Sequence, residues 1–121
     1  MAKAALESVG YQTRDLREAM SADWKATGVQ PTLRVDGGMV ANDWLMQFLA
    51  DICDRPVLRP EYREMTALGA AALAAMQLGW LGAKAWTERP VKGARFEPQM
   101  GGGARSALIK GWQDAMRKTL A

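Results

Sequence analysis

Apolar side chains in the first part of the chain recur at steps of three and four residues, which predicts a helix over residues 4–20. The expected buried stripe consists of Leu6, Val9, Thr13, Leu16 and Met20. The polar side chains that fall mostly on the other face are Glu7, Gln12, Arg14, Asp15, Arg17 and Glu18. Gly10 interrupts this helix, and an interior glycine of this kind often indicates close packing against a neighbouring element.

A polar connector over residues 21–31 leads into a short apolar run, and residues 32–35 predict a strand. A second helix is expected to begin at residue 41 or 42 and to end at residue 53. Its apolar face would be formed by Leu45, Phe48, Leu49 and Ile52. Asn42 and Asp43 are both natural N-cap residues, because their side chains can accept the free N–H groups of the first turn.

Another short strand is expected around Val57 and Leu58, between two prolines. Strand, helix and strand in this order predict a parallel βαβ unit, and so an α/β fold with helices flanking a short parallel sheet. A third helix, rich in alanine, is predicted over residues 67–76. Thr66 would cap its start, and Gly79 lies where its C-terminus would be.

The apolar pattern weakens beyond residue 80, so residues 80–121 are expected to form a less regular tail. A terminal helix is predicted over residues 105–120, preceded by a flexible lead of three glycines at residues 101–103. A phosphate-binding loop is not favoured at these glycines, because no strand precedes them and no Lys-Ser/Thr pair follows. The tryptophans have no regular spacing and are expected to fill core and interface positions: Trp24, Trp44, Trp80, Trp86 and Trp112.

The composition indicates one small domain with a packed core, since 49% of the 121 residues are hydrophobic. The formal net charge of +3 comes from interspersed charges, which favours a solvated mixed surface over nucleic-acid binding. With no histidine and the single Cys53, the sequence offers neither a structural zinc site nor histidine catalysis. Cys53 is expected to be a small buried residue rather than a reactive thiol. No apolar run is long enough to cross a bilayer, so we expect a cytoplasmic protein without membrane contact.

The most informative stretch joins the first strand to the second helix. Gly37 and Gly38 lack a Cβ, so the backbone there can approach a ligand, and the helix that follows offers free N–H groups. This pattern is typical of nucleotide pockets, but an ordinary strand-to-helix turn uses the same residues. Asp36 could act as a general base, although beside glycines it is better explained as a hydrogen-bonding turn residue. Asn42 could serve as an N-cap, as a nucleotide contact, or as both.

Taken together, the linked motifs resemble the C-terminal part of the FGGY carbohydrate kinases, and most closely those members that phosphorylate glycerol. The matching segments, in order along nearly the whole chain, are residues 5–16, 33–42, 45–48, 50–52, 59–60, 64–71, 96–100 and 111–112. The resemblance implies the latter part of the second actin-like (ribonuclease-H-like) lobe, as a single partial domain over residues 1–121. Met39 and Trp44 depart from the side chains common in the family, and residues 101–103 replace a more polar segment.

The resemblance also implies a site. ATP would lie in the cleft between two lobes, with Gly38 and Asn42 in contact with the nucleotide on the adenine side, and with Gly37 and Asp36 shaping the turn. Mg²⁺ would accompany the nucleotide and would not be held by side chains of this chain. The glycerol site and the catalytic aspartate of the family lie in preceding sequence, so no catalytic residue is expected here.

Two further hypotheses from other classes remain open. The chain could be a non-catalytic product that acts as an interaction module and self-associates as a homo-oligomer. The missing strands of the lobe would leave a bare sheet edge and exposed apolar stripes, which favour such pairing. Nucleic-acid binding is the weaker alternative, and it predicts an affinity that falls steeply with salt.

Overall fold

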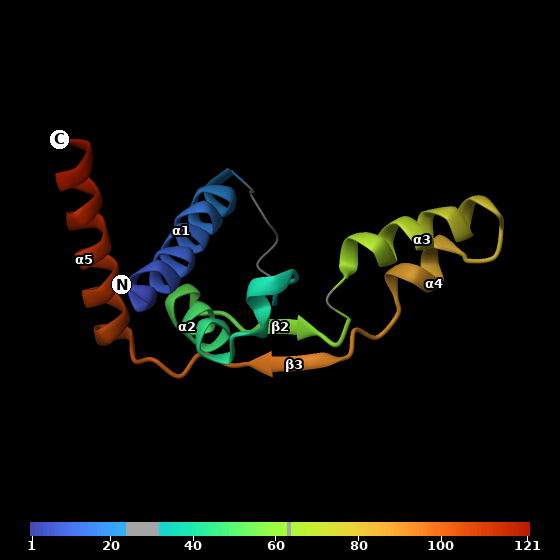
Figure 1. The fold of residues 1–121 in the computed structure, drawn as a ribbon, viewed down its shortest axis with the longest axis horizontal. Helices are drawn as coiled ribbons and strands as arrows, with labels where there is room; N and C mark the ends of the chain where they lie inside the picture. Colours follow the sequence, from blue (N-terminus) through green and yellow to red (C-terminus); the bar gives the residue numbers. More distant parts are fainter. Residues whose placement is uncertain (24–31, 63) are drawn as a thin grey trace.

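A computed structural model describes residues 1–23, 32–62 and 64–121 (Figure 1). The helices and strands run in the order α1 (Ala2–Asp23), β1 (Leu33–Arg34), the 3₁₀ helix η1 (Gly38–Ala41), α2 (Asp43–Cys53), β2 (Val57–Pro60), α3 (Met65–Gln77), α4 (Ala83–Thr87), β3 (Gly93–Phe96) and α5 (Gly102–Leu120). Most of the expected connector, residues 24–31, lies outside the described residues, and its first three residues belong to α1. No helix in the described ranges combines the length and apolar character needed to span a bilayer.

The sheet has the strand order β1-β2-β3 and is mixed. β1 and β2 are parallel, with Leu33 opposite Val57, so the predicted βαβ unit is confirmed. β3 was not predicted, and it is antiparallel to β2, with Phe96 opposite Val57, so the sheet contains an antiparallel strand beside the predicted parallel pair. β3 is a largely exposed strand without apolar alternation, so its sequence resembles a loop and gave no strand signal.

Gly93 allows β2 and β3 to approach each other. A Cβ placed on Gly93 would lie 2.0 Å from the Arg59 carbonyl oxygen, well inside any permitted contact. The obstacle is backbone, which cannot rotate away as a flexible side chain could. Glycine is therefore required at this strand position for a steric reason.

Helix α2 lies beside α1 and the sheet (Figure 1). The core is centred on α2, whose side chains pack against both. Leu45, Ile52 and Val57 are the largest fully buried side chains. The predicted apolar face of α2 is confirmed, because Leu45, Phe48, Leu49 and Ile52 are all buried. Cys53 is also buried, and this burial raises the pKa of its thiol to about 11, so it is an inert packing residue as predicted.

The buried face of α1 differs from the predicted one. Leu6, Val9 and Thr13 are half-buried as expected, but Leu16 and Met20 are 63% and 55% exposed. The most buried residues are Gly10 and Tyr11, and two of the expected outer residues, Arg14 and Arg17, are half-buried. The face of α1 that contacts α2 is therefore centred on Gly10, and it is rotated by about one residue relative to the predicted apolar stripe.

Gly10 is the point of closest approach between α1 and α2. A Cβ on this residue would lie 2.6 Å from Cε1 of Phe48, so only a glycine fits against the ring. The expectation of close packing at Gly10 is confirmed.

The alanine-rich helix α3 and the short helix α4 form a hairpin that extends away from the sheet (Figure 1). α3 begins at Met65, with Glu64 at the N-cap position, so the predicted cap at Thr66 is wrong because Thr66 already lies inside the helix. Gly79 ends the helix as predicted: its φ is +73°, and its N–H donates to the Met76 carbonyl at 3.0 Å. Helix α4 was not predicted.

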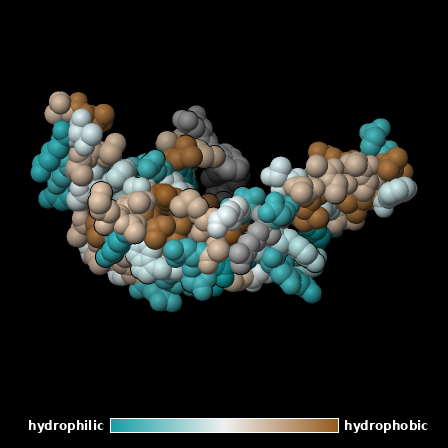
Figure 2. Space-filling model, viewed as in Figure 1, coloured by the Kyte–Doolittle hydropathy of each residue, from teal (hydrophilic) through white to brown (hydrophobic). Residues whose placement is uncertain are grey.

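Many apolar side chains of the hairpin are open to solvent, and they form the hydrophobic surface at that end of the molecule (Figure 2). Leu73 is 69% exposed and Trp80 is 80% exposed. Ala72 is the only buried residue of α3, although the helix is apolar nearly all round. Such a helix normally packs inside a larger core.

The terminal helix α5 begins at Gly102, so Gly102 and Gly103 form its first turn and are not a flexible lead. Arg105 fixes this start, because its Nε donates to the Asp51 carbonyl at 2.6 Å and its guanidinium pairs with Asp54. Further along, Trp112 stacks on Tyr11 with ring centroids 5.2 Å apart. Trp112 thus fills an interface as predicted, whereas Trp80 is largely solvated.

Candidate functional site

The candidate site is the turn between β1 and α2. Gly37 has φ +93° and ψ 179°, a backbone conformation that residues with a side chain rarely adopt. A glycine is therefore needed at this position for the chain to follow the turn. Gly38 opens η1, and a Cβ built there would meet no atom within 4 Å. The second glycine therefore leaves open space above the turn. Val40 is 4% exposed and anchors the turn to the core.

Asn42 links the turn to α2 as its N-cap. Its Oδ1 accepts the N–H of Leu45 at 3.0 Å, and its main-chain carbonyl accepts the N–H of Met46 at 3.1 Å. Its own N–H donates to the Met39 carbonyl at 3.2 Å. The predicted cap is confirmed. Because Oδ1 is engaged, the Nδ2 group is the part of this exposed side chain that remains to donate outward.

Arg59 of β2 reaches the same turn and was not identified from the sequence. Its Nη1 donates to the Val40 carbonyl at 2.8 Å and to Oδ1 of Asp43 at 2.6 Å. Its guanidinium also lies 5.2 Å from the centre of the Phe96 ring. An isolated arginine in a short strand has no periodic signal, so only the three-dimensional structure could reveal this contact.

A hollow of about 200 Å³ lies beside the turn, outside the carboxyl ends of the parallel strands β1 and β2. It is lined by Arg34, Val35, Asp36, Pro60, Met65, Arg89 and Val91. Open α/β sheets bind ligands at this end of their strands. Arg89, which the sequence also did not single out, is held there by the Trp86 ring, 3.4 Å from the guanidinium carbon. Asp36 lines the hollow and is exposed, and it makes no side-chain hydrogen bond within the described residues, so the predicted hydrogen bond of this turn residue is wrong.

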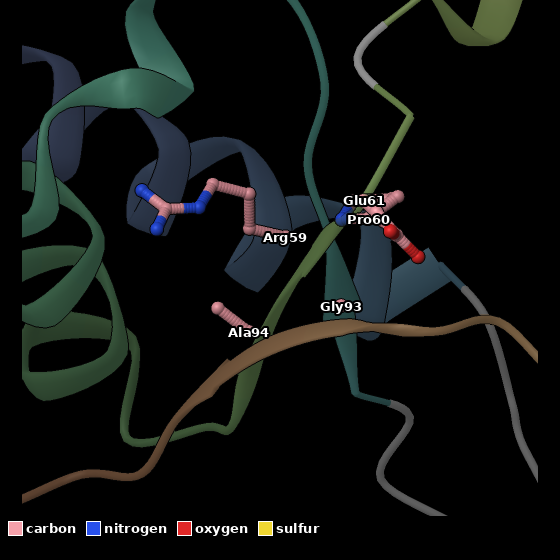
Figure 3. A pocket seen from close by; sticks show the side chains of 5 residues that line it. All are labelled: Arg59, Pro60, Glu61, Gly93 and Ala94. Carbon is pink, nitrogen blue, oxygen red and sulfur yellow. The ribbon is translucent and has the colours of Figure 1, made fainter.

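A larger hollow, about 360 Å³, lies beside the paired strands β2 and β3 and is lined by Arg59, Pro60, Glu61, Gly93 and Ala94 (Figure 3). It contains none of the predicted site residues. The smaller hollow is the better candidate, because it includes Asp36 and adjoins the glycine turn. The smaller hollow has a volume below the 300–1,000 Å³ of typical ligand pockets. A hollow of this size can form one wall of a binding site rather than the whole pocket.

The structure thus brings the predicted residues together in one continuous turn. Asp36 and Gly37 follow β1, Gly38 opens η1, and Asn42 begins α2. Within residues 1–23, 32–62 and 64–121, no three carboxylate or cysteine side chains gather in a way that could hold a metal ion. What the turn can offer a ligand is close backbone approach and an amide donor.

The sequence of this chain is similar to one family of kinases. Residues 1–78 match the model of the FGGY family of carbohydrate kinases, C-terminal domain. The chain is 52% identical over 121 residues to the glycerol kinase of Allorhizobium ampelinum and 53% identical over 120 residues to that of Brucella ovis. These alignments cover 99% and 98% of this chain, but in each case 24% of the relative.

Two solved structures share the fold. The glycerol kinase of Plasmodium falciparum, crystallised with ADP, has a TM-score of 0.83 and 28% identity, covering 98% of this chain and 24% of the other. The ligand-bound xylulose kinase of Lactobacillus acidophilus has a TM-score of 0.72 and 21% identity, covering 99% of this chain and 24% of the other. The chain is therefore folded as the corresponding part of these actin-like kinases, as the sequence predicted.

Proposed function

This chain belongs to the FGGY family of carbohydrate kinases, and we propose that it supplies one wall of the nucleotide pocket in an enzyme that phosphorylates glycerol with ATP. The observation that carries the proposal is the turn from Asp36 to Asn42, which lies at the carboxyl ends of two parallel strands. Relatives more than half identical to this chain are named glycerol kinases, and the glycerol kinase of Plasmodium falciparum was solved with ADP.

The proposed roles follow from the turn geometry. Gly37 sets the backbone path, Gly38 leaves room for the base, and the Nδ2 group of Asn42 donates a hydrogen bond to an acceptor nitrogen of adenine. Asp36 shapes the entrance of the hollow. Mg²⁺ enters with the nucleotide and neutralises phosphate charge.

In the reaction, a glycerol hydroxyl attacks the γ-phosphate in line and yields glycerol 3-phosphate and ADP. The chain spans 24% of the length of the curated relatives it matches. We assign the catalytic base and the glycerol site to the remainder of such an enzyme, and we expect no phosphorylation of glycerol by the 121-residue chain alone. The use of ATP and the single buried cysteine favour a cytoplasmic setting.

Titration of the isotope-labelled chain with Mg²⁺ and ADP, followed by NMR, tests this proposal. We expect shifts centred on residues 36–43, and we expect Gly38→Val to weaken ADP binding about tenfold or more, since its side chain would fill the space left for the base. The fold should tolerate this change, because Gly38 has open space around its Cβ position. Gly69→Val is the matched control, because Gly69 also has open space but lies on α3. Equal affinities of the Gly38→Val and unsubstituted chains would remove the turn from the site.

A second candidate function, as a self-associating interaction module, is favoured by the exposed apolar hairpin of α3 and α4 (Figure 2). We expect sedimentation equilibrium to show a mass that rises from monomer towards dimer with concentration. Trp80→Glu should abolish the rise, because it places a charge in the apolar surface. Leu120→Glu, at an equally exposed position on α5, should not. A constant monomer mass at high concentration would rule out this function.

A further inference from the structure

The side chain of Arg59 joins three elements that meet at the candidate turn. It rises from β2, and in Figure 3 it points away from Pro60 and Glu61 toward the ribbon of η1 and the start of α2. Its Nη1 contacts the Val40 carbonyl in η1 and the Asp43 carboxylate, the first residue of α2. The side chain is only 17% exposed, although Asp43 is 74% exposed.

These two contacts lie on either side of Asn42. Val40 is two residues before it, and Asp43 is the next residue along the chain. One guanidinium nitrogen is therefore bonded to the backbone before the amide side chain and to the side chain after it. Hydrogen bonds from a charged donor are shorter and stronger than neutral ones, so the arginine restrains the path of the backbone through Asn42.

The guanidinium is itself held in place. Phe96 of β3 supports it from the sheet, with 5.2 Å between the guanidinium carbon and the ring centre. Strand β3 is paired with β2, and Gly93 permits the close approach of the two strands. The position of Asn42 is thus connected through Arg59 to both of these strands.

We propose that Arg59 is a positioning residue, which holds the turn so that the Nδ2 group of Asn42 meets the adenine ring. This inference rests on the proposed nucleotide site. It adds a residue that does not touch the nucleotide but sets the geometry of the residue that does. Surface ion pairs contribute little on average, so the part of the interaction that matters is the bond to the Val40 carbonyl.

Two variants of the 121-residue chain test the role of Arg59. Arg59→Met keeps the apolar stem over Phe96 but removes both hydrogen bonds, whereas Arg59→Lys keeps one charged donor. Arg95→Met is the control, because Arg95 lies on β3 and bonds to Glu97, not to the turn. Amide hydrogen exchange is measured at Val40 and Asn42, and also at Val35, whose N–H donates to the Leu58 carbonyl of β2 and not to η1 or α2. ADP affinity is measured alongside by NMR titration with Mg²⁺.

We expect Arg59→Met to speed exchange at Val40 and Asn42 about tenfold more than at Val35, and to weaken ADP binding by a similar factor. Arg59→Lys should recover part of both effects, and Arg95→Met should show neither. If Arg59 serves only general stability, exchange will rise equally at all three amides, which would overturn the proposal. If Arg59→Met does not fold, the same comparison is made with Arg59→Leu, which also removes both hydrogen bonds, and unchanged exchange and affinity in that variant would overturn the proposal.

The outcomes also separate this inference from the proposed function. Normal ADP binding by both the unsubstituted and the Arg59→Met chains would overturn the role of Arg59 and leave the nucleotide site standing. No ADP binding by the unsubstituted chain would overturn the proposed function, and the nucleotide role of Arg59 with it. Faster local exchange together with weaker ADP binding supports both.

Discussion

Replacing Gly10 with valine is expected to lower the free energy of unfolding by about 3 kcal/mol or more. Even the Cβ atom would lie 2.6 Å from Cε1 and 2.8 Å from Cδ1 of the Phe48 ring. That ring cannot move aside easily, since it is 6% exposed, stacks on Trp44 and makes an edge contact with Tyr11. The substitution therefore pushes α1 away from α2, where most of the core lies. Chemical denaturation followed by circular dichroism measures the loss.

Gly111→Val provides a matched control for this prediction. Gly111 is also an interior helix glycine, but a Cβ there would meet nothing within 4 Å. The two residues differ by only a few tenths of a kcal/mol in helix propensity, so this change should leave stability within about 0.5 kcal/mol. Combining Gly10→Val with Phe48→Leu should cost less than the sum of the two single changes, because the smaller side chain relieves the clash. A Gly10→Val protein as stable as Gly111→Val would contradict the packing account.

The parts of the fold that the sequence predicted are those in which local chemistry and burial agree. Helix α2 has a capping amide at Asn42, apolar residues at helical spacing and a buried last residue, Cys53. These three features of the sequence all predict the same helix. The parallel pairing of β1 and β2 follows because strands that flank a single helix connect most readily in that way. Gly37 was singled out because glycine allows close backbone approach, and its positive φ in the structure is a second reason for a glycine at this position.

The parts that were missed depend on long-range contacts. Strand β3 is short and exposed, and its pairing with β2 becomes evident only from the structure, with Gly93 opposite Pro60. The buried face of α1 is centred on Gly10, which has no side chain and therefore adds nothing to a hydrophobic pattern. Arg59 bonds to a carbonyl 19 residues away in sequence, and no spacing rule predicts such a contact. The turn was thus predictable as a candidate site, but the residues that support it were not.

Replacing Asn42 with aspartate is expected to separate its role as the cap of α2 from its proposed contact with the nucleotide. Aspartate caps helices as well as asparagine does, and its negative charge at a helix N-terminus is favourable, so stability should be unchanged or slightly raised. The variant nevertheless presents an acceptor where Asn42 has its amide donor, since Oδ1 is bonded to the Leu45 N–H at 3.0 Å. Two acceptors facing each other repel, and a buried polar group left unpaired costs about 1–3 kcal/mol. ADP affinity should therefore fall about tenfold or more.

Two further variants make this prediction specific. Asn42→Ala removes both roles, so it should lower the free energy of unfolding by about 1 kcal/mol and also weaken ADP binding. Ala41→Asp places the same added charge on the exposed neighbouring residue but keeps the amide, and its smaller effect on affinity measures general repulsion of the phosphates. Calorimetry or NMR titration with Mg²⁺ and ADP gives the affinities, and denaturation gives the stabilities. If Asn42→Asp binds ADP as tightly as the unsubstituted chain, or no more weakly than Ala41→Asp, then Asn42 serves only as the cap of α2. The nucleotide would then have to be recognised by the backbone around Gly38.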